Sequence, residues 1–413
     1  MKSTEYLLNE SKYFCMMPWV HMHIWPNGNC MPCCMSDSTD IFGNINDNPM
    51  SEVINSDKYK ELRTQMLNDQ GPKACTRCYE LEETAGTHTL RKNSLSMFGN
   101  LIHLVEDTGV DGSISDFKMR YMDIRFSNLC NMKCRTCGPD LSSSWHDDQI
   151  KLHPDYPVPK FIDVSSSPDF MSELETHLRY VEEVYFAGGE VLITPQHYEV
   201  LDFWLQNSMD YVRLRYTTNF SALNYKKKSM LNYWNMFRDV RIAASLDSFG
   251  PKAEYLRSGT HWDSIVKNRE LLLEHCPNVY FEITPTISLF SIHSLFEFHR
   301  DWVDKGYLDI NNIRINILTY PRHFSITILP QKMKDDLTEL FKEYVDWLEN
   351  NGAYEHTISS IKGIVEHMNS ADNSELIPQF IKQTQIIDEV RNETFTDVFQ
   401  EYNELWQRMI KIS

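Results

Sequence analysis

Six short apolar segments recur along the middle of the chain, and their spacing constrains the fold more than any other feature. They are rich in β-branched and aromatic residues and are bounded by turn or charged residues, as strands are. The last five begin 29, 29, 39 and 33 residues apart. A strand with its crossover helix takes about 30 residues, so this spacing predicts a parallel sheet with helical connections. The segments are YMDIRF (121–126), EEVYFA (182–187), YVRLRYTT (211–218), VRIAASL (240–246), VYFEITPT (279–286) and NIRINIL (312–318).

Six such units are too few to close an eight-unit barrel. The sequence therefore predicts an α/β fold, a partial (β/α)6 TIM-like barrel over residues 96–325. Residues 1–95 are expected to form a small α+β domain, because VHMHIW and NCMPCC flank an Asn-Gly turn that is typical of a β-hairpin, with a helix to follow over 51–67. Helices expected over 329–351 and from about 375 to 411 would form a helical extension over 326–413.

Composition limits the partners of the chain. Its 413 residues carry a formal net charge of −18, which disfavours nucleic acid and anionic membrane surfaces as partners. No apolar run reaches the length that spans a membrane, and the segment MKSTEYLLNE lacks the apolar region of a signal peptide. We therefore expect a cytoplasmic protein. In that reducing compartment, clustered cysteines bind metal or do redox chemistry more often than they form disulfides.

Three cysteines follow the first predicted barrel strand directly, and they are Cys130, Cys134 and Cys137. Spacings of this kind let one short loop bring three thiolates to a common centre. Structural zinc and ordinary iron–sulfur clusters take four protein ligands. Three thiolates on a four-iron cluster leave one iron open, as a catalytic site requires. A zinc site, or three loop cysteines without a metal, is the alternative interpretation.

The Cys-x3-Cys-x2-Cys spacing resembles the signature of the radical S-adenosylmethionine (SAM) superfamily. The resemblance implies that these cysteines hold a [4Fe–4S] cluster whose open iron binds the amino and carboxylate groups of SAM. An electron from the cluster would then cleave SAM to methionine and a 5′-deoxyadenosyl radical, which abstracts hydrogen from a substrate. The chain is thus identified as a member of a family of SAM-dependent oxidoreductases and modifying enzymes.

Further residues match the SAM-binding elements of this family. Two glycines and a glutamate follow the second predicted strand and resemble the GGE element that holds the methionyl amine of SAM; they are Gly188, Gly189 and Glu190. Glycine permits close backbone approach to a ligand. Asn219 and Ser245 lie at the ends of the third and fourth predicted strands, and the resemblance implies contacts with the ribose or carboxylate of SAM. It likewise implies that Arg257 contacts the carboxylate.

A second cysteine set lies in the first 95 residues. The segment resembles the SPASM/twitch auxiliary-cluster module, and its cysteine count suits the shorter twitch version. The resemblance implies that a second [4Fe–4S] cluster is held by Cys15, Cys33, Cys75 and Cys78. The matching elements are Cys15-x2-Pro18-Trp19, Ile24-x-Pro26-Asn27-Gly28, Pro32-Cys33-Cys34, Gly43-Asn44-Ile45 and Cys75-x2-Cys78.

Other ligand sets stay open for this segment. Cys30-x2-Cys33 with Cys75-x2-Cys78 also has the spacing of a zinc site. Cys30 or Cys34 is an alternative to Cys33 as a cluster ligand. His21 and His23 lie on the same face of the hairpin and are expected to be surface or packed residues.

The resemblance implies an oxidative modification of a peptide or protein, with an auxiliary cluster that relays electrons and an external donor such as flavodoxin or ferredoxin. One alternative is a radical SAM enzyme that acts on a small molecule, sugar or nucleotide. The other is a zinc-stabilised binding protein that does not cleave SAM.

Overall fold

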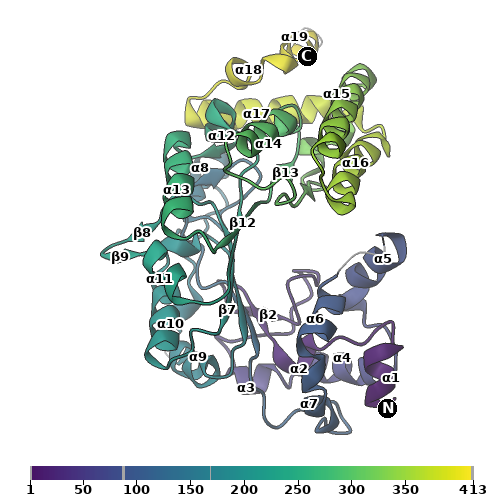
Figure 1. The fold of residues 1–413 in the computed structure, drawn as a ribbon, viewed down its shortest axis with the longest axis vertical. Coiled ribbons are helices and arrows are strands. Elements are labelled where there is room, and N and C mark those ends of the chain that lie inside the picture. Colours follow the sequence, from purple (N-terminus) through teal and green to yellow (C-terminus); the bar gives the residue numbers. More distant parts are fainter. Residues whose placement is uncertain (1, 86–88, 168, 411–413) are drawn as a thin grey trace. The chain divides into compact units, whose positions relative to one another are not determined.

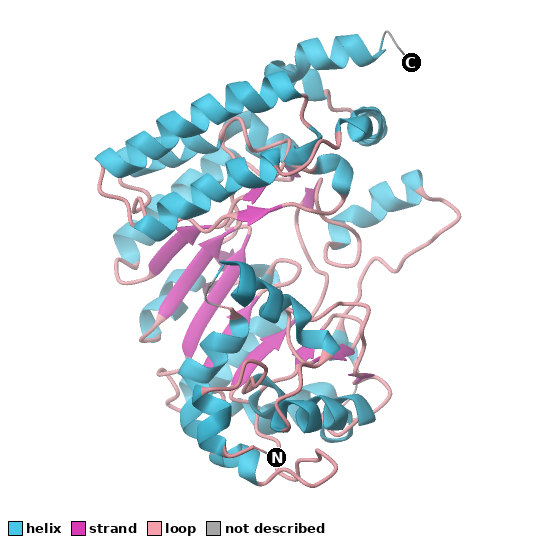
Figure 2. Cartoon of the chain, turned by 90° about the vertical axis from the view of Figure 1, so that its right-hand side faces the viewer, coloured by secondary structure: helices cyan, strands magenta, loops and turns pink. Residues whose placement is uncertain are grey.

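The computed structural model describes residues 2–85, 89–167 and 169–410. It is an α/β structure whose main strands pair largely in parallel, which confirms the predicted fold class at that level. The chain divides into two compact units. The first comprises Met1–Asn128, Phe161–Arg215 and Met236–Asp239, and the second comprises Leu129–Lys160, Tyr216–Asn235 and Val240–Ser413. Figures 1 and 2 show the helices and strands of each. The division into 1–95, 96–325 and 326–413 stays a prediction.

The first unit begins with the predicted hairpin. Strand β1 pairs antiparallel with β2, and Gly28 at the turn has a φ of +83°, a conformation that favours glycine. The prediction of one helix over 51–67 is wrong, because the structure has two helices there, Met50–Val53 and Asp57–Leu67. Asn55, at the break, exchanges two hydrogen bonds with the backbone of Ile114, so a tertiary contact interrupts the helix. The elements are α1 (Thr4–Asn9), α2 (Met17–Val20), β1 (His23–Ile24), β2 (Asn29–Met31), β3 (Gly43–Asn44), α3 (Met50–Val53), α4 (Asp57–Leu67), α5 (Thr76–Ala85), α6 (Leu90–Phe98) and α7 (His103–Glu106).

The hairpin joins the sheet that contains the first two predicted barrel strands. Strand β1 pairs in parallel with β4, and β4 pairs in parallel with β6, so the strand order in this unit is β6-β4-β1-β2-β3. Every residue of β4 is buried, as expected for a strand in the interior of a sheet. The other elements are β4 (Tyr121–Ile124), α9 (Phe170–Leu178), β6 (Glu183–Phe186), α10 (Pro195–Gln206) and the beginning of β7 (Arg213–Thr218).

In the second unit, the end of β7 neighbours β10, and β10 pairs in parallel with β12. The strand predicted over 279–286 ends at Ile283, because Pro285 has no N–H with which to continue the ladder. The elements up to residue 283 are β5 (Lys133–Cys134), α8 (His146–Leu152), β8 (Asn224–Tyr225), β9 (Lys228–Ser229), α11 (Met230–Met236), β10 (Val240–Ala244), α12 (Gly250–Leu256), β11 (Arg257–Ser258), α13 (Trp262–His275) and β12 (Tyr280–Ile283).

The sixth predicted strand, over 312–318, is shorter than expected. Only β14 forms, paired in parallel with β13 in a separate two-stranded sheet, and Ile313 adds an isolated bridge to Ile283. The size of the barrel therefore stays a prediction. The elements of this region are β13 (Thr286–Ile287), α14 (Leu295–Asp304) and β14 (Asn316–Ile317).

The chain after residue 325 is helical, as predicted, although the sequence did not predict α16. Helices α15 and α16 pack side by side (Figure 1). Aromatic side chains of α17 and α18 pack together, with Phe380 and Phe395 5.5 Å apart at their ring centroids. Among the described residues, none of the helices is long and apolar enough to cross a membrane. The helices are α15 (Gln331–Asn350), α16 (Glu355–Asn369), α17 (Ile377–Arg391), α18 (Phe395–Val398) and α19 (Asn403–Ile410).

Candidate functional site

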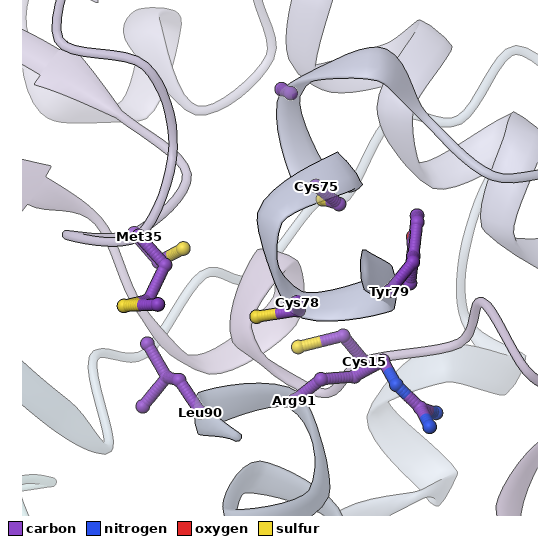
Figure 3. A pocket seen from close by; sticks show the side chains of 9 residues that line it. Cys15, Met35, Cys75, Cys78, Tyr79, Leu90 and Arg91 are labelled. Carbon is purple, nitrogen blue, oxygen red and sulfur yellow. The ribbon is translucent and has the colours of Figure 1, made fainter. Parts of the chain in front are cut away.

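The first unit contains a cavity that all four predicted auxiliary-cluster ligands line (Figure 3). Cys15 lies two residues before α2, Cys33 follows β2, Cys75 immediately precedes α5 and Cys78 lies in the first turn of α5. The sulfur atoms of Cys15 and Cys78 point to the same part of the cavity in Figure 3. The fold thus brings together three segments of the chain that are up to 63 residues apart in sequence.

The lining of this cavity suits an iron–sulfur cluster. Besides the four cysteines it contains the apolar residues Met35, Ala74 and Leu90, together with Tyr79 and Arg91. Burial raises the pKa of the Cys15 thiol to about 11, so this group is neutral until a metal displaces its proton. A cluster held by four thiolates is fully ligated, and an apolar wall keeps water from its sulfides.

Arg91 supplies a positive charge at the edge of the cavity. Its guanidinium forms an ion pair with Glu82, which also accepts a hydrogen bond from the Thr89 hydroxyl group. The Arg91 Nη1 donates to the backbone oxygen of Phe14 at 3.1 Å, immediately before Cys15. These contacts fix the backbone that carries the first cysteine.

Cys30 and Cys34 are absent from the described lining of the cavity. Cys30 is fully buried, and its Sγ lies 3.4 Å from the backbone oxygen of Gly28 on the hairpin. Cys34 is exposed. This geometry favours the set that contains Cys33, Cys15 and the Cys75–Cys78 pair over the zinc interpretation, which requires Cys30.

The cysteine triad lies in the second unit, in a loop held by a serine-rich segment. The N–H of Cys130 donates to Ser143 Oγ at 3.2 Å, and the backbone oxygen of Cys130 accepts from Ser144 Oγ at 2.8 Å. The indole N–H of Trp145 donates to the backbone oxygen of Cys134 at 2.9 Å. The N–H of Cys137 donates to the backbone oxygen of Cys134 at 3.0 Å, and this bond closes the turn between the two cysteines. These hydrogen bonds hold the loop that carries the three thiols, and their role as ligands of a cluster with an open iron stays a prediction.

Arg257 lies beside the middle cysteine. Strand β11 pairs antiparallel with β5, and Arg257 and Cys134 are register partners. The Arg257 Nη1 is 3.5 Å from Cys134 Sγ, and its Nε is 2.7 Å from Asp247 Oδ2. Burial raises the pKa of the Cys134 thiol, and the neighbouring Arg257 charge partly offsets this effect. The predicted contact of Arg257 with SAM stays a prediction.

Asn219 also reaches the cysteine loop. Its Nδ2 donates to Asn131 Oδ1 at 2.9 Å, and Asn131 is the residue after Cys130. Ser245 is half-buried at the end of β10, where its N–H donates to the backbone oxygen of Thr218 at 2.8 Å. In this unit, therefore, the ends of β7 and β10 carry the predicted polar residues, and one of them touches the loop.

The GGE turn belongs to the first unit, immediately after β6. Gly188 and Gly189 have φ angles of +84° and +48°, which explains why this turn needs glycine. A Cβ atom at Gly188 would lie 2.7 Å from the Cδ of Arg125. Glu190 is buried, and its Oε1 accepts from the N–H of Leu192 at 3.0 Å. The carboxylate is therefore fixed by the short helical turn that follows it.

Sequence reasoning named His21 and His23 but missed Asp123, the β4 residue that completes a buried cluster with them. His21, His23 and Asp123 are buried, and each offers a possible ligand atom within 4.8 Å of the others. His23 Nδ1 is 3.2 Å from Asp123 Oδ2, and Arg125 Nε is 2.9 Å from Asp123 Oδ1. The two histidines alternate with apolar residues along the sequence, and that pattern signals only that they share one face.

The hydrogen bonds of this cluster argue against a metal ion. The indole N–H of Trp25 donates to His23 Nε2 at 2.9 Å, so neutral His23 carries its proton on Nδ1, which faces Asp123. His23 therefore has no lone pair to offer toward Asp123. Both histidines are buried, as expected of packed residues, and that they are not metal ligands stays a prediction.

Comparison with known protein families agrees with an iron–sulfur cluster in the cavity of the first unit. Residues 15–79 match SPASM, an iron–sulfur cluster-binding domain. This segment contains all four cysteines that line the cavity. No curated protein matches the chain.

Solved structures give a weaker likeness. Native anSMEcpe with bound AdoMet and Cp18Cys peptide is 12% identical, with 56% of this chain and 61% of that chain covered and a TM-score of 0.35. Streptococcus suis SuiB bound to S-adenosylmethionine is 14% identical, with 70% and 63% covered and a TM-score of 0.37. The chain spans less than two thirds of the length of these structures. Similarity at this level carries no inference about function.

The SPASM match falls on the segment for which the sequence predicts an auxiliary iron–sulfur module. The match agrees with the predicted iron–sulfur cofactor. Residues 15–79 of this chain are therefore similar to SPASM, an iron–sulfur cluster-binding domain.

Proposed function

We propose that the protein is a radical SAM enzyme with one auxiliary [4Fe–4S] cluster. The observation that carries this proposal is the cavity lined by Cys15, Cys33, Cys75 and Cys78 inside a SPASM domain, in a chain that also has the cysteine triad. When bound, a three-thiolate cluster with SAM supplies reductive cleavage of SAM and a carbon radical that abstracts hydrogen. Three residues would hold that cluster, and they are Cys130, Cys134 and Cys137.

The residues of the chain have distinct parts in this proposal. Gly188, Gly189 and Glu190 bind the amine of SAM through backbone and carboxylate oxygens. Asn219 holds the cysteine loop through Asn131, with which it shares a hydrogen bond of 2.9 Å, and contacts the ribose or carboxylate of SAM together with Ser245. Arg257, beside Cys134, binds the carboxylate of SAM and favours the thiolate.

The auxiliary cluster would relay one electron, because hydrogen abstraction followed by net oxidation of a substrate leaves an electron to remove. Four thiolates leave no open iron, so this cluster would not bind substrate directly. We propose a peptide or protein as the substrate by analogy with relatives that carry this module, and an external flavodoxin-like or ferredoxin-like donor. A small molecule, sugar or nucleotide is the second candidate.

Metal analysis tests the two-cluster proposal. After anaerobic reconstitution, two [4Fe–4S] clusters predict about eight irons and eight sulfides per chain, without zinc. Cys134→Ala and Cys75→Ser should each remove about half of the iron. About four irons with one tightly held zinc would contradict the auxiliary cluster.

Activity tests the chemistry. With dithionite as reductant, the reconstituted protein should convert SAM to 5′-deoxyadenosine, and Cys134→Ala should abolish that conversion. Stimulation by peptides and not by metabolites would support the peptide substrate. A reconstituted protein that leaves SAM intact would favour a binding protein.

A further inference from the structure

A buried arginine lies inside the cysteine triad. Arg135, between Cys134 and Cys137, has a fully buried side chain. Its Nη2 is 2.5 Å from Asp388 Oδ1 on α17 and 2.5 Å from Glu393 Oε2, just beyond the end of that helix. The guanidinium also stacks on the ring of Tyr255, 3.7 Å from the ring centroid. The charge of Arg135 is therefore balanced by two carboxylates from the C-terminal helices, more than 250 residues away in the sequence.

A second contact ties the other side of Cys134 to the same helix. Lys133 Nζ is 2.9 Å from Asp148 Oδ1 on α8, and the other oxygen of Asp148 is 2.7 Å from Arg391 Nε at the end of α17. The Arg391 guanidinium lies 4.6 Å from the ring centroid of Trp145, whose indole holds the backbone oxygen of Cys134. Arg391 and Asp148 are almost fully buried.

Both residues that flank Cys134 are thus cations whose partners are on, or are tied to, α17. We propose that α17 positions the cysteine-triad loop and sets the electrostatic environment of its cluster, with Asp388, Glu393 and Arg391 as positioning residues. This inference rests on the proposed function, since it assigns the helical extension a part in the SAM-binding cluster. In this proposal α17 has a role beyond packing within the helical extension.

Loss of these carboxylates should affect the triad cluster in two ways. Residues that hold a metal ligand in place from outside the coordination sphere commonly change metal affinity 10–100-fold when removed. The potential of an iron–sulfur cluster follows the charge around it. Loss of the two carboxylates leaves the Arg135 cation buried and unbalanced next to Cys134, which favours the reduced, more negative cluster. The loop loses its anchor in the same change.

The test compares Asp388→Asn/Glu393→Gln with the wild type in the full chain. We expect iron to leave the SAM-responsive cluster for a chelator about tenfold faster, and we expect the midpoint potential of that cluster to become more positive. The perturbation of the reduced-cluster EPR signal by SAM identifies the triad cluster and separates it from the auxiliary cluster. Glu339→Gln is the matched control, because it removes an exposed partner of Lys342 on α15 in the same unit.

A triple variant separates charge from simple loosening of the fold. Adding Arg135→Gln to the double variant removes the unbalanced cation, so the potential should return toward the wild-type value while iron release stays fast. A merely structural role would leave the potential of the triple variant where the double variant has it. If the double variant does not fold, Glu393→Gln alone carries the same comparison, because that carboxylate is partly exposed.

Equal iron release and equal potential in the wild type, the double variant and Glu339→Gln would overturn the inference and leave the proposed function intact. A wild-type protein without any SAM-responsive cluster would overturn the proposed function, and the inference with it.

Discussion

His23 and Asp123 are register partners in the parallel pairing of β1 and β4, and their side chains meet with His23 Nδ1 3.2 Å from Asp123 Oδ2. The histidine belongs to the segment that matches SPASM, and the aspartate belongs to the first strand that the barrel pattern predicts. Asp123 also binds Arg125, whose side chain lies against Gly188 of the GGE turn. Contacts between side chains therefore connect the hairpin of the SPASM-like segment to the predicted SAM-binding turn.

Asp123→Asn should destabilise the protein strongly. The Asp123 side chain is fully buried and balances the largely buried Arg125 guanidinium, so its neutralisation leaves that cation without its partner. Breaking a buried pair from one side costs about 3 kcal/mol or more of the free energy of unfolding. Urea unfolding of both proteins measures the difference. Asp116→Asn, which removes an exposed partner of Lys118, is the control and should leave stability nearly unchanged.

Gly188→Ala should impair SAM binding and spare both clusters. The new Cβ meets the Cδ of Arg125 at 2.7 Å, and the φ of +84° disfavours any side chain. We expect at least about a tenfold increase in the dissociation constant of SAM, since 1.4 kcal/mol of strain suffices for that change. Equilibrium binding of SAM to the reconstituted protein provides the value.

The control for this substitution is Gly363→Ala. Gly363 lies within α16, where an added Cβ meets no atom within 4 Å. Alanine there should keep SAM affinity and increase stability, since alanine favours a helix by up to about 1 kcal/mol over glycine. Unchanged SAM affinity in Gly188→Ala would argue against the assignment of this turn.

Cys33→Ser and Cys30→Ser should differ in iron content. Cys33 lines the four-cysteine cavity, whereas Cys30 bonds its own hairpin at Gly28. We expect Cys33→Ser to lose about four of eight irons after reconstitution and Cys30→Ser to keep all of them. Iron, sulfide and zinc analysis of both variants provides the comparison. Zinc bound in the wild type and lost from both variants would favour the zinc site that uses Cys30 and Cys33.

Acid should weaken the fold through buried histidines. Burial lowers the pKa of His21 and of His299 to about 4, below the value of about 6.5 for histidine in an unfolded chain. Between these values the unfolded state binds more protons, so the free energy of unfolding falls as pH decreases from 6.5 towards 4. Each histidine contributes at most about 1.4 kcal/mol per pH unit.

His299→Gln should reduce that pH dependence by the share of one histidine. Glutamine does not titrate, and it can still bond the Tyr344 hydroxyl group, which lies 2.6 Å from His299 Nδ1. Urea unfolding followed by tryptophan fluorescence at pH 7 and pH 5.5 measures the slope. His275→Gln, at an exposed site, should leave the slope as it is in the wild type. An unchanged slope in His299→Gln would show that this histidine is protonated to the same extent in both states.

Local pattern was sufficient to predict five of the strands, β4, β6, β7, β10 and β12, because apolar runs and turn signals are properties of short segments. It failed where distant residues decide the structure. Asn55 ends a helix through its bonds to Ile114, and nothing between residues 51 and 67 signals that contact. Pro285 does signal the end of β12 in the sequence, because proline has no N–H with which to continue the strand pairing.

The candidate site likewise contains residues that the sequence predicted and contacts that it did not predict. The spacing of the cysteines predicted which four of them would line one cavity, because that spacing belongs to a known module. The partners of Arg135 had no such signal. Asp388 and Glu393 lie more than 250 residues from it in the sequence, and only the folded chain brings these charges together.

The pairing of β1 with β4 makes the N-terminal segment, which matches SPASM, hard to remove from the rest of the first unit. In the first unit β4 lies between β6 and β1, so removal of the first 95 residues would strip the backbone N–H and C=O groups on one side of a fully buried strand. Such an uncovered edge is a template for pairing with other chains. The truncated protein would therefore aggregate rather than persist as a smaller folded protein.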